Sequence, residues 1–212
     1  MPAPVCVFDL DHTLVNSPLD LRGVARDMEA FVRGRGVPLP VREQRWSAPE
    51  LFDLVRREAA HLAAEVLAIP QAHERQAMEH ATLEPHAAET LTAVRALGFA
   101  TALWTNNDRV VADTVLARFD LLPHLDLIVT RDDVERLKPD PDGLRVVRAR
   151  WPLAPRIVVV GDSWVDGAAA NAAGVPFIHY GGNNAEMDRR GVTAAARIAS
   201  LRDLAALLDS NA

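Results

Sequence analysis

The spacing of apolar residues divides the chain into two kinds of pattern. Residues 5–8 form a short, continuously apolar run that ends at Asp9, which is typical of a buried β-strand. From about residue 18 to residue 84 the apolar residues instead recur at helical spacing, and we expect no strand there. Beyond Pro85, short apolar runs alternate with helical segments, as they do in chains built from β-α-β units. The pattern therefore predicts an α/β fold that carries an inserted helical block.

The inserted block contains a recognisable helix start. Ser47, Pro49 and Glu50 form the pattern of a helix N-terminus with a capping box. Pro70 is expected to end the helix that begins there, because proline lacks the backbone N–H that a helix interior needs. A third helix is predicted over about residues 71–82, which completes a small all-α block.

The second part of the chain predicts a parallel sheet. Strands that are apolar throughout are buried on both faces, as in a Rossmann-like parallel sheet sandwiched by helices. We therefore expect a core domain of residues 1–16 and 85–212 and an all-α domain of residues 17–84. The predicted strands after the first span about 99–104, 125–129, 157–160 and 175–179, and the predicted helices about 86–97, 109–119, 142–150, 165–173 and 201–208.

Composition narrows the class of protein. A chain of 212 residues is long enough for one core and a smaller inserted module. Its formal net charge of -6, with arginines scattered among acidic residues, argues against partners such as nucleic acid or an anionic membrane. Cys6 is the only cysteine, so we expect it to fill core space. No signal-like segment or long apolar run is present, and we expect a cytoplasmic monomer or homodimer.

Polar side chains collect where the predicted strands end. Asp9 and Asp11 follow the first strand, and two neighbouring carboxylates at a buried edge raise each other's pKa unless a cation offsets their charge. Oxygen ligands of this kind suit Mg²⁺, which pairs readily with substrate phosphate. Ligands of an open parallel sheet bind at the carboxyl ends of its strands. The other polar residues at these ends are Thr13, Thr105, Asn106, Asn107, Lys138, Asp162, Ser163 and Asp166.

Lys138 stands out because it is the only lysine in the chain. Every other fixed basic side chain is an arginine, so the composition replaces lysine almost everywhere. Retention of one lysine at a predicted site indicates a need for a compact ammonium group, which the planar guanidinium of arginine does not supply. Chance survival of a loop lysine is the competing interpretation.

Four motifs in this order resemble those of the haloacid dehalogenase (HAD) superfamily. They are Asp9-Leu-Asp-His-Thr13, Thr105 at a strand end, Lys138-Pro-Asp-Pro141 and Gly161-Asp-Ser-Trp-Val-Asp166. The stretch from Asn171 to Ile178 also resembles the helix-to-strand segment that follows the fourth motif in phosphoglycolate-phosphatase-like members of this superfamily. The resemblance covers nearly the whole chain and extends to the inserted helical block, which matches the α-helical cap domain of subclass I. It implies a HAD-like core with a cap that closes over the site.

The resemblance also implies roles for individual residues. Asp9 would be the nucleophile that forms an aspartyl phosphate, and Asp11 the general acid and base. Thr105, Lys138 and Asn106 would bind the phosphoryl oxygens. Mg²⁺ would be held by Asp9, the Asp11 backbone carbonyl and Asp162, with Asp166 as a ligand or as a partner through water. The implied activity is Mg²⁺-dependent hydrolysis of a small phosphorylated metabolite, either phosphoglycolate or a sugar-phosphate-like monoester.

Structural interpretations of the same residues compete with these roles. Asp11 and Thr13 would cap a turn, Thr105 and Asn106 would close a strand into a helix, and Asp162 would cap the next helix. His12, Arg42, Arg45 and Trp46 are candidate substrate contacts, with packing or solvated surface as the alternative.

Two other functions remain open. A phosphomutase of the β-phosphoglucomutase type shares all four motifs, and the absence of a lysine from the helical block favours the phosphatase only slightly. A non-catalytic binding protein on the same scaffold is the other alternative. Loss of Asp11, Lys138 or a metal carboxylate would be expected in such a protein, and all of them are present.

Overall fold

The computed structural model describes residues 2–181 and 184–210 and divides them into two compact units. The first unit runs up to Ser17 and resumes at Ala81, and the second unit is Pro18–His80. Each unit has its own buried apolar cluster. Among the described residues, no helix has both the length and the apolar character needed to cross a bilayer.

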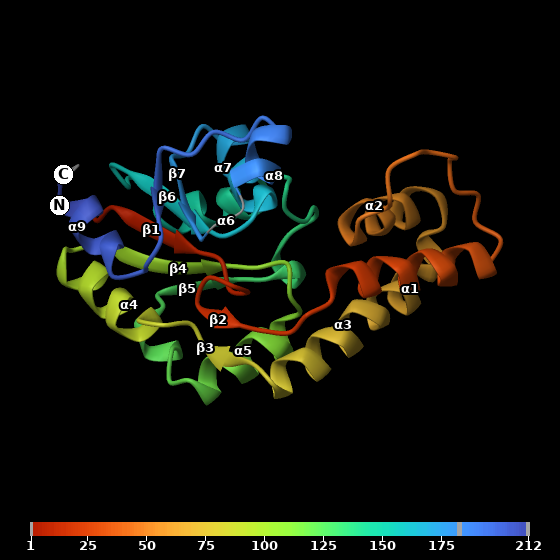
Figure 1. Ribbon diagram of the computed structural model, residues 1–212, viewed down its shortest axis with the longest axis horizontal. Helices are drawn as coiled ribbons and strands as arrows, with labels where there is room; N and C mark the ends of the chain where they lie inside the picture. The colour runs from red at the N-terminus through yellow and green to blue at the C-terminus, as the bar shows by residue number, and fades with distance from the viewer. Residues whose placement is uncertain (1, 182–183, 211–212) are drawn as a thin grey trace. The chain divides into compact units, whose positions relative to one another are not determined.

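The first unit is built on a parallel sheet with β1 at its centre (Figure 1). In the described part of the chain the sheet has six strands in the order β5-β4-β1-β6-β7-β8. Val5 in β1 pairs with Ala100 on one side and Ile157 on the other, and every residue of β1 is fully buried. Burial also raises the pKa of the Cys6 thiol, as expected for a cysteine that fills core space. The strands are β1 (Val5–Phe8), β4 (Ala100–Trp104), β5 (Leu127–Val129), β6 (Ile157–Gly161), β7 (Phe177–Tyr180) and β8 (Ala196–Ile198).

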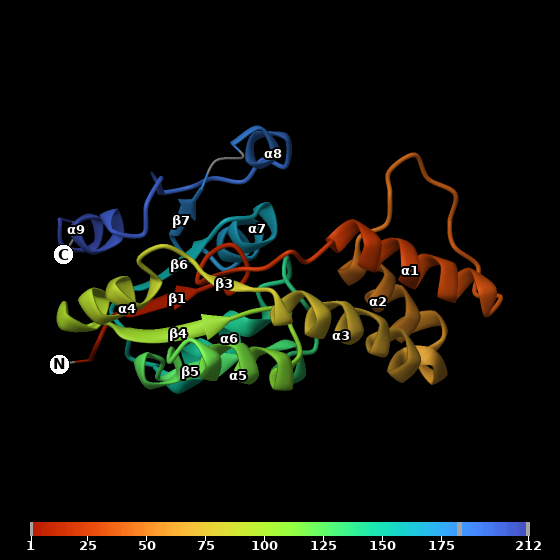
Figure 2. The same ribbon diagram turned by 60° about the horizontal axis from the view of Figure 1, so that its bottom comes forward.

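Helices cover both faces of this sheet (Figure 2). One face packs against α6, α7 and α8, which contribute Leu144, Ala169 and Met187 to its buried cluster. On the other face lie α4, α5 and α9. The α/β class predicted from the apolar runs is thus confirmed. The helices are α4 (Ala87–Ala96), α5 (Arg109–Arg118), α6 (Asp142–Arg150), α7 (Trp164–Ala172), α8 (Asn184–Arg189) and α9 (Asp203–Asp209).

A small antiparallel pair joins the two chain segments of the first unit. Strand β2 (Val15–Asn16) pairs with β3 (Thr82–Leu83), so the expectation that residues 18–84 contain no strand is wrong. Each strand has only two residues, which is too short to give a recognisable period. Residues 81–84 therefore belong to the first unit, whereas the sequence pattern assigned them to the helical block.

The second unit is a bundle of α1 (Leu21–Gly34), α2 (Ala48–Glu58) and α3 (Ala63–Glu79). The predicted start of α2 is confirmed, because Ser47 is its N-cap and the Glu50 carboxylate accepts the Ser47 backbone N–H at 2.8 Å. Pro70 does not end this helix: α2 stops at Glu58, and α3 continues through Pro70.

The packing of α3 explains how a proline is tolerated in its interior. Val66, Pro70, Glu74 and Ala77 recur every three or four residues and are all buried on one face of the helix. Burial of this face outweighs the cost of the hydrogen bond that proline cannot make, which is about 3 kcal/mol in a helix interior.

Candidate active site

The turn after β1 holds Asp9 and Asp11 at the carboxyl edge of the sheet. The backbone N–H of Asp9 donates to the Val160 carbonyl at 2.9 Å, which continues the ladder between β1 and β6. The Asp11 carboxylate accepts hydrogen bonds from the Ser17 hydroxyl and, at 2.6 Å, from the Asn107 side-chain amide. Burial raises the pKa of Asp11, although these two hydrogen bonds oppose the shift. Asp11 is thus oriented by its neighbours rather than by capping its own turn.

Lys138 is buried among acceptors at the same edge. Its Nζ donates to Asp9 Oδ1 at 2.6 Å, to Asp166 Oδ1 at 2.6 Å and to the Trp104 carbonyl at 2.8 Å. Burial alone would lower the pKa of Lys138, but the charges of Asp166 and Asp9 outweigh it and raise the pKa. The ammonium group is therefore charged and is fixed between two carboxylates.

Asn106 and Thr105 support this arrangement from the end of β4. The Asn106 side chain accepts the Lys138 backbone N–H at 2.9 Å and donates to the Lys138 carbonyl at 3.1 Å. This pair of hydrogen bonds fixes the loop that carries Lys138. Thr105 is buried, and its hydroxyl accepts the Asn107 backbone N–H at 3.1 Å. The N-cap of the following helix is Asp108, so neither Thr105 nor Asn106 caps it.

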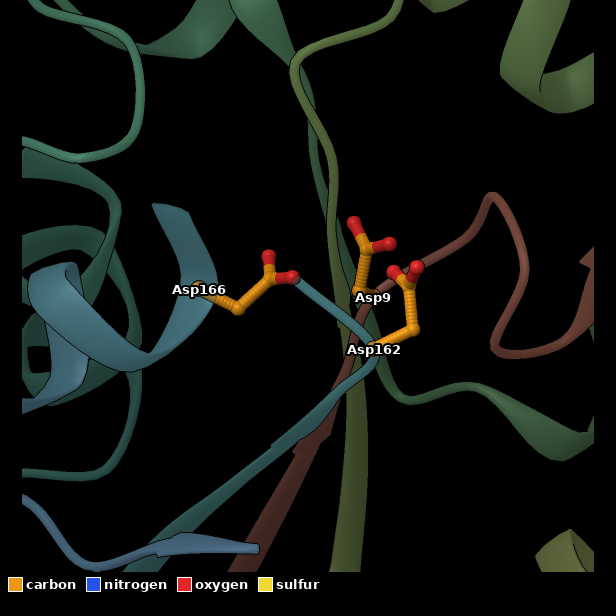
Figure 3. A group of neighbouring side chains, drawn as sticks. All are labelled: Asp9, Asp162 and Asp166. Carbon is orange, nitrogen blue, oxygen red and sulfur yellow. The ribbon is translucent and has the colours of Figure 1, made fainter. Parts of the chain in front are cut away.

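Within the described residues, Asp9, Asp162 and Asp166 come close enough to hold one metal ion. Ligand atoms of the three carboxylates lie within 4.8 Å of one another (Figure 3). Asp166 lies in the first turn of α7, where its Oδ2 accepts the Ser163 backbone N–H at 3.2 Å. Ser163, not Asp162, is the N-cap of α7, so the structural interpretation of Asp162 as a helix cap is wrong.

This acidic group carries more negative charge than its protein neighbours balance. Burial, followed by the charge of Asp166, raises the pKa of Asp9 despite the opposing effect of Lys138. Burial and the charges of Asp166 and Asp9 likewise raise the pKa of Asp162. The donor set consists of carboxylate oxygens, which are the ligands that Mg²⁺ prefers. The residues present therefore fit a hard divalent cation.

His12 lies on the surface beside this group. Its φ of 56° places it in the left-handed region, and its side chain is exposed. It lines a hollow of about 320 Å³ together with Asn16, Glu84, Asp162, Tyr180, Gly181 and Ala199. Because Asp162 also lines this hollow, His12 is near the acidic group, and a contact with substrate stays a prediction.

Arg42, Arg45 and Trp46 belong to the second unit. The Arg42 guanidinium lies 4.0 Å from the centre of the Trp46 ring and donates to both Glu50 carboxylate oxygens at 3.0 Å. It also donates to the Gln44 and Arg45 carbonyls. Arg42 and Trp46 therefore organise the loop between α1 and α2. Arg45 is exposed, and no hydrogen bond or ion pair of its side chain is found within residues 18–80.

Three residues that contact the site had no role assigned from the sequence. Ser17 and Asn107 hold the Asp11 carboxylate, and His179 Nε2 lies 3.0 Å from the Asp162 carbonyl oxygen. Asn107 was visible as a polar residue at a strand end but had no assigned partner. His179 could have been noticed as a polar side chain within an apolar strand.

The chain is similar to one family model and to several known proteins. The family model of haloacid dehalogenase-like hydrolases matches residues 3–174. A protein of Cupriavidus necator named "Phosphoglycolate phosphatase, plasmid" is 34% identical over 206 residues, which cover 85% of this chain and 83% of that protein. A phosphoglycolate phosphatase of Cereibacter sphaeroides is 35% identical over 185 residues, covering 82% and 83% of the two chains. The crystal structure of a hydrolase from Pseudomonas syringae superposes with a TM-score of 0.70 at 24% identity, covering 99% of each chain, which shows a shared fold.

Proposed function

Because this chain belongs to the haloacid dehalogenase-like hydrolase family and is a phosphoric monoester hydrolase, we propose that it is a Mg²⁺-dependent phosphatase that acts through an aspartyl phosphate. The observation that carries this proposal is the position of Lys138. Its ammonium group bonds to both Asp9 and Asp166, and these two carboxylates approach Asp162 closely enough to share a cation. One site thus offers a nucleophile, positive charge for a phosphoryl group and ligands for a metal.

We assign Asp9 the role of nucleophile. Its carboxylate oxygen attacks phosphorus while the ester oxygen leaves, which transfers the phosphoryl group to Asp9. Water then attacks the same phosphorus, releases inorganic phosphate and restores the carboxylate. Two displacements at one carboxylate replace a single, more difficult hydrolysis step. The ion pair with Lys138 supports this role, since it fixes one oxygen of Asp9 at the carboxyl edge of the sheet.

We assign Asp11 the role of general acid and base. Burial raises the pKa of Asp11, which favours a protonated carboxyl that can donate to the leaving oxygen. After this donation, the resulting carboxylate accepts a proton from the attacking water. The hydrogen bonds from Ser17 and Asn107 support both steps because they hold the side chain in one orientation.

Mg²⁺, when bound, would neutralise charge on the transferring phosphoryl group. The residues that would hold it are Asp9, Asp162 and the backbone carbonyl of Asp11, with Asp166 as a ligand or as a partner through water. Thr105 and Lys138 would bind phosphoryl oxygens. Asn106 was expected to do the same, but its side chain holds the backbone of Lys138, and we therefore propose that it positions this lysine.

We propose a small phosphorylated metabolite as substrate. Relatives that carry the name phosphoglycolate phosphatase and cover most of the chain support phosphoglycolate or a related monoester. We further propose that the helical unit acts as a substrate-selecting cap, because it is inserted between the first two motifs of the chain. Arg45 is the arginine of its loop whose side chain is not engaged within that unit, so it is the better candidate for a substrate contact than Arg42.

Turnover of an aryl phosphate tests the proposed function. Wild-type protein is expected to release phosphate in the presence of MgCl₂, and this release should stop when EDTA is added. The Asp9→Asn variant is expected to lose at least about a thousandfold in rate, because an amide is a poor nucleophile. Asp188→Asn, at an exposed position of α8, is the matched control and should retain the wild-type rate. Undiminished turnover by Asp9→Asn, or by wild-type protein in EDTA, would contradict the proposal.

The same assay identifies the substrate class. Phosphoglycolate and a panel of sugar phosphates are compared by kcat/KM, and glucose 1-phosphate is followed for both release of phosphate and conversion to glucose 6-phosphate. Release of phosphate is the expected result. Isomerisation without release would instead support the phosphomutase.

A further inference from the structure

His179 stands at the carboxyl end of β7, beside the acidic group but outside it. In the strand register it lies opposite Gly161, the residue that precedes Asp162. Its side chain is fully buried, and its Nε2 lies 3.0 Å from the Asp162 carbonyl oxygen. A carbonyl oxygen can only accept a hydrogen bond, so Nε2 carries the hydrogen and donates it. His179 therefore restrains the backbone at Asp162.

Packing alone does not explain a histidine at this position. The strand β7 is otherwise buried and mostly apolar, and a buried polar group destabilises the fold unless its hydrogen bonds are satisfied. Within the part of the chain that the structure describes, His179 Nδ1 is buried without a hydrogen-bond partner. A leucine would fill similar space without burying an unsatisfied nitrogen. The histidine thus has a cost in stability, which points to a role other than filling the core.

The peptide group between Asp162 and Ser163 is held from both sides. Its carbonyl oxygen accepts from His179, and its N–H, which belongs to Ser163, donates to Asp166 Oδ2 at 3.2 Å. A peptide group is planar, so two hydrogen bonds in opposite directions fix its orientation and with it the backbone dihedral that follows the Asp162 Cα. The Asp162 Cα, which carries the carboxylate that approaches Asp9 and Asp166, is bonded directly to this peptide group.

We propose that His179 is a positioning residue for the metal-binding carboxylate of Asp162. By holding the Asp162–Ser163 peptide group, it keeps the Asp162 carboxylate close enough to Asp9 and Asp166 for the group to hold one cation. This inference rests on the proposed function, because it requires that the acidic group bind a divalent cation. Partners outside the ligand shell commonly change metal affinity by about 10- to 100-fold when they are removed.

A pair of amide substitutions separates this role from packing. In His179→Gln the side-chain amide reaches about as far as Nε2 and can donate to the Asp162 carbonyl, whereas in His179→Asn it is too short. Both variants bury an amide in place of an imidazole, so the cost in stability of burying a polar group is similar in the two. His179→Leu removes the donor and keeps the bulk. Phe177→Leu is the control for packing, since Phe177 is buried on the same strand and its ring lies 6.1 Å from that of His179.

The experiment measures Mg²⁺ binding to metal-free protein by isothermal titration calorimetry and by the rise in Tm with MgCl₂. We expect the Kd for Mg²⁺ to rise about tenfold or more in His179→Asn and His179→Leu, and to stay within about threefold of wild type in His179→Gln. Phe177→Leu should lower Tm without changing the Kd. If one variant does not fold, the remaining variants still separate donor loss from packing loss.

The outcomes that overturn the inference are distinct from failure of the proposed function. Wild-type affinity for Mg²⁺ in His179→Asn and His179→Leu, or an equal loss in Phe177→Leu, would refute the role of His179 alone. Absence of Mg²⁺ binding in the wild-type protein would instead refute the metal site of the proposed function, and the inference with it.

Discussion

Two ion-pair networks of similar geometry lie in very different surroundings. In the first unit, Lys138 pairs with Asp9 and Asp166 at 2.6 Å, and the three side chains are 3%, 11% and 1% exposed. In the second unit, Arg42 pairs with Glu50 at 3.0 Å, with side chains 26% and 48% exposed. Contact distance alone would not distinguish the two networks. Burial and the balance of charge do.

The pKa directions show how the two networks differ. Burial alone would raise the pKa of Glu50, but hydrogen bonds from Arg42 and Ser47 outweigh it and lower the pKa to about 2. The pKa values of Asp9 and Asp162 are raised instead, first by burial and then by neighbouring carboxylates, because one ammonium group cannot balance them all. The exposed network is electrostatically complete within its own unit. The buried network is incomplete, which is typical of a site that receives a charged ligand.

Amide substitutions at Asp11, which lies beside the buried network, and at Glu50, which belongs to the exposed network, should differ most in their effect on turnover. Asp11→Asn is expected to reduce kcat by about 10²–10⁴-fold, because an amide cannot transfer the proton, while leaving the fold intact. Glu50→Gln makes the same chemical change in the exposed network and should leave kcat unchanged. Steady-state kinetics together with circular dichroism measure both effects. A wild-type rate in Asp11→Asn would refute its acid and base role.

Replacing the basic side chain of each network should show how much each network contributes to stability. Lys138→Met leaves Asp9 and Asp166 buried without a counter-charge, and we expect the free energy of unfolding at pH 8 to fall by about 3–5 kcal/mol. Arg42→Met removes an exposed ion pair and should cost about 1 kcal/mol or less. Urea denaturation of both variants measures the difference. Equal losses would show that burial of Lys138 has no special consequence.

The pH dependence of stability tests the charge excess directly. The raised pKa values of Asp9 and Asp162 mean that the folded state keeps protons that the unfolded state has already released. The free energy of unfolding of metal-free protein should therefore fall as pH rises from about 5 to about 8. The contribution of Glu50 has the opposite sign and is complete above about pH 5, so it does not change in this window.

Mg²⁺ should reverse this loss of stability. A bound cation favours the ionised carboxylates, so the gain in Tm on adding MgCl₂ should be larger at pH 8 than at pH 5. Thermal unfolding in EDTA and in MgCl₂ across this range provides the measurement. A Tm in EDTA that rises toward pH 8, with no effect of MgCl₂, would contradict an uncompensated acidic group.

The smallest expected effect comes from the capping residue of the exposed network. Ser47→Ala removes a hydrogen bond to Glu50 at the start of α2 and should lower stability by about 1 kcal/mol. The pKa of Glu50 should rise toward its ordinary value, which NMR titration of its side chain would detect. Turnover should not change, and a loss of activity would show that α2 contributes more to function than the network in the second unit indicates.

The sequence predicted the features that depend on pattern and missed those that depend on local geometry. Continuous apolar runs identified β1 and β6, and helical spacing identified α6 over the residues that it occupies. The strands β2 and β3 have only two residues each, which is too few to show an alternation of apolar and polar residues. The helix end predicted at Pro70 was wrong because the tertiary packing of α3 outweighs the tendency of proline to end a helix.

The same distinction between sequence pattern and local geometry applies to the residues of the site. Asp9, Lys138 and Asp166 were expected together because the carboxyl ends of parallel strands meet at one edge, and the structure brings them together. The hydrogen bonds of Asn106 to Lys138 and of His179 to Asp162 involve backbone atoms. Which backbone groups face a side chain is set by loop conformation, so residue types alone did not reveal these contacts.

The most direct test of the central claim is to look for the phosphoryl group on Asp9. Wild-type protein is mixed with substrate and MgCl₂, quenched in acid during turnover and analysed by mass spectrometry. We expect the peptide that contains Asp9 to gain the mass of one phosphoryl group, and to lose this modification in EDTA. Steady turnover without modification of that peptide, together with normal rates in Asp9→Asn, would contradict the role of this carboxylate.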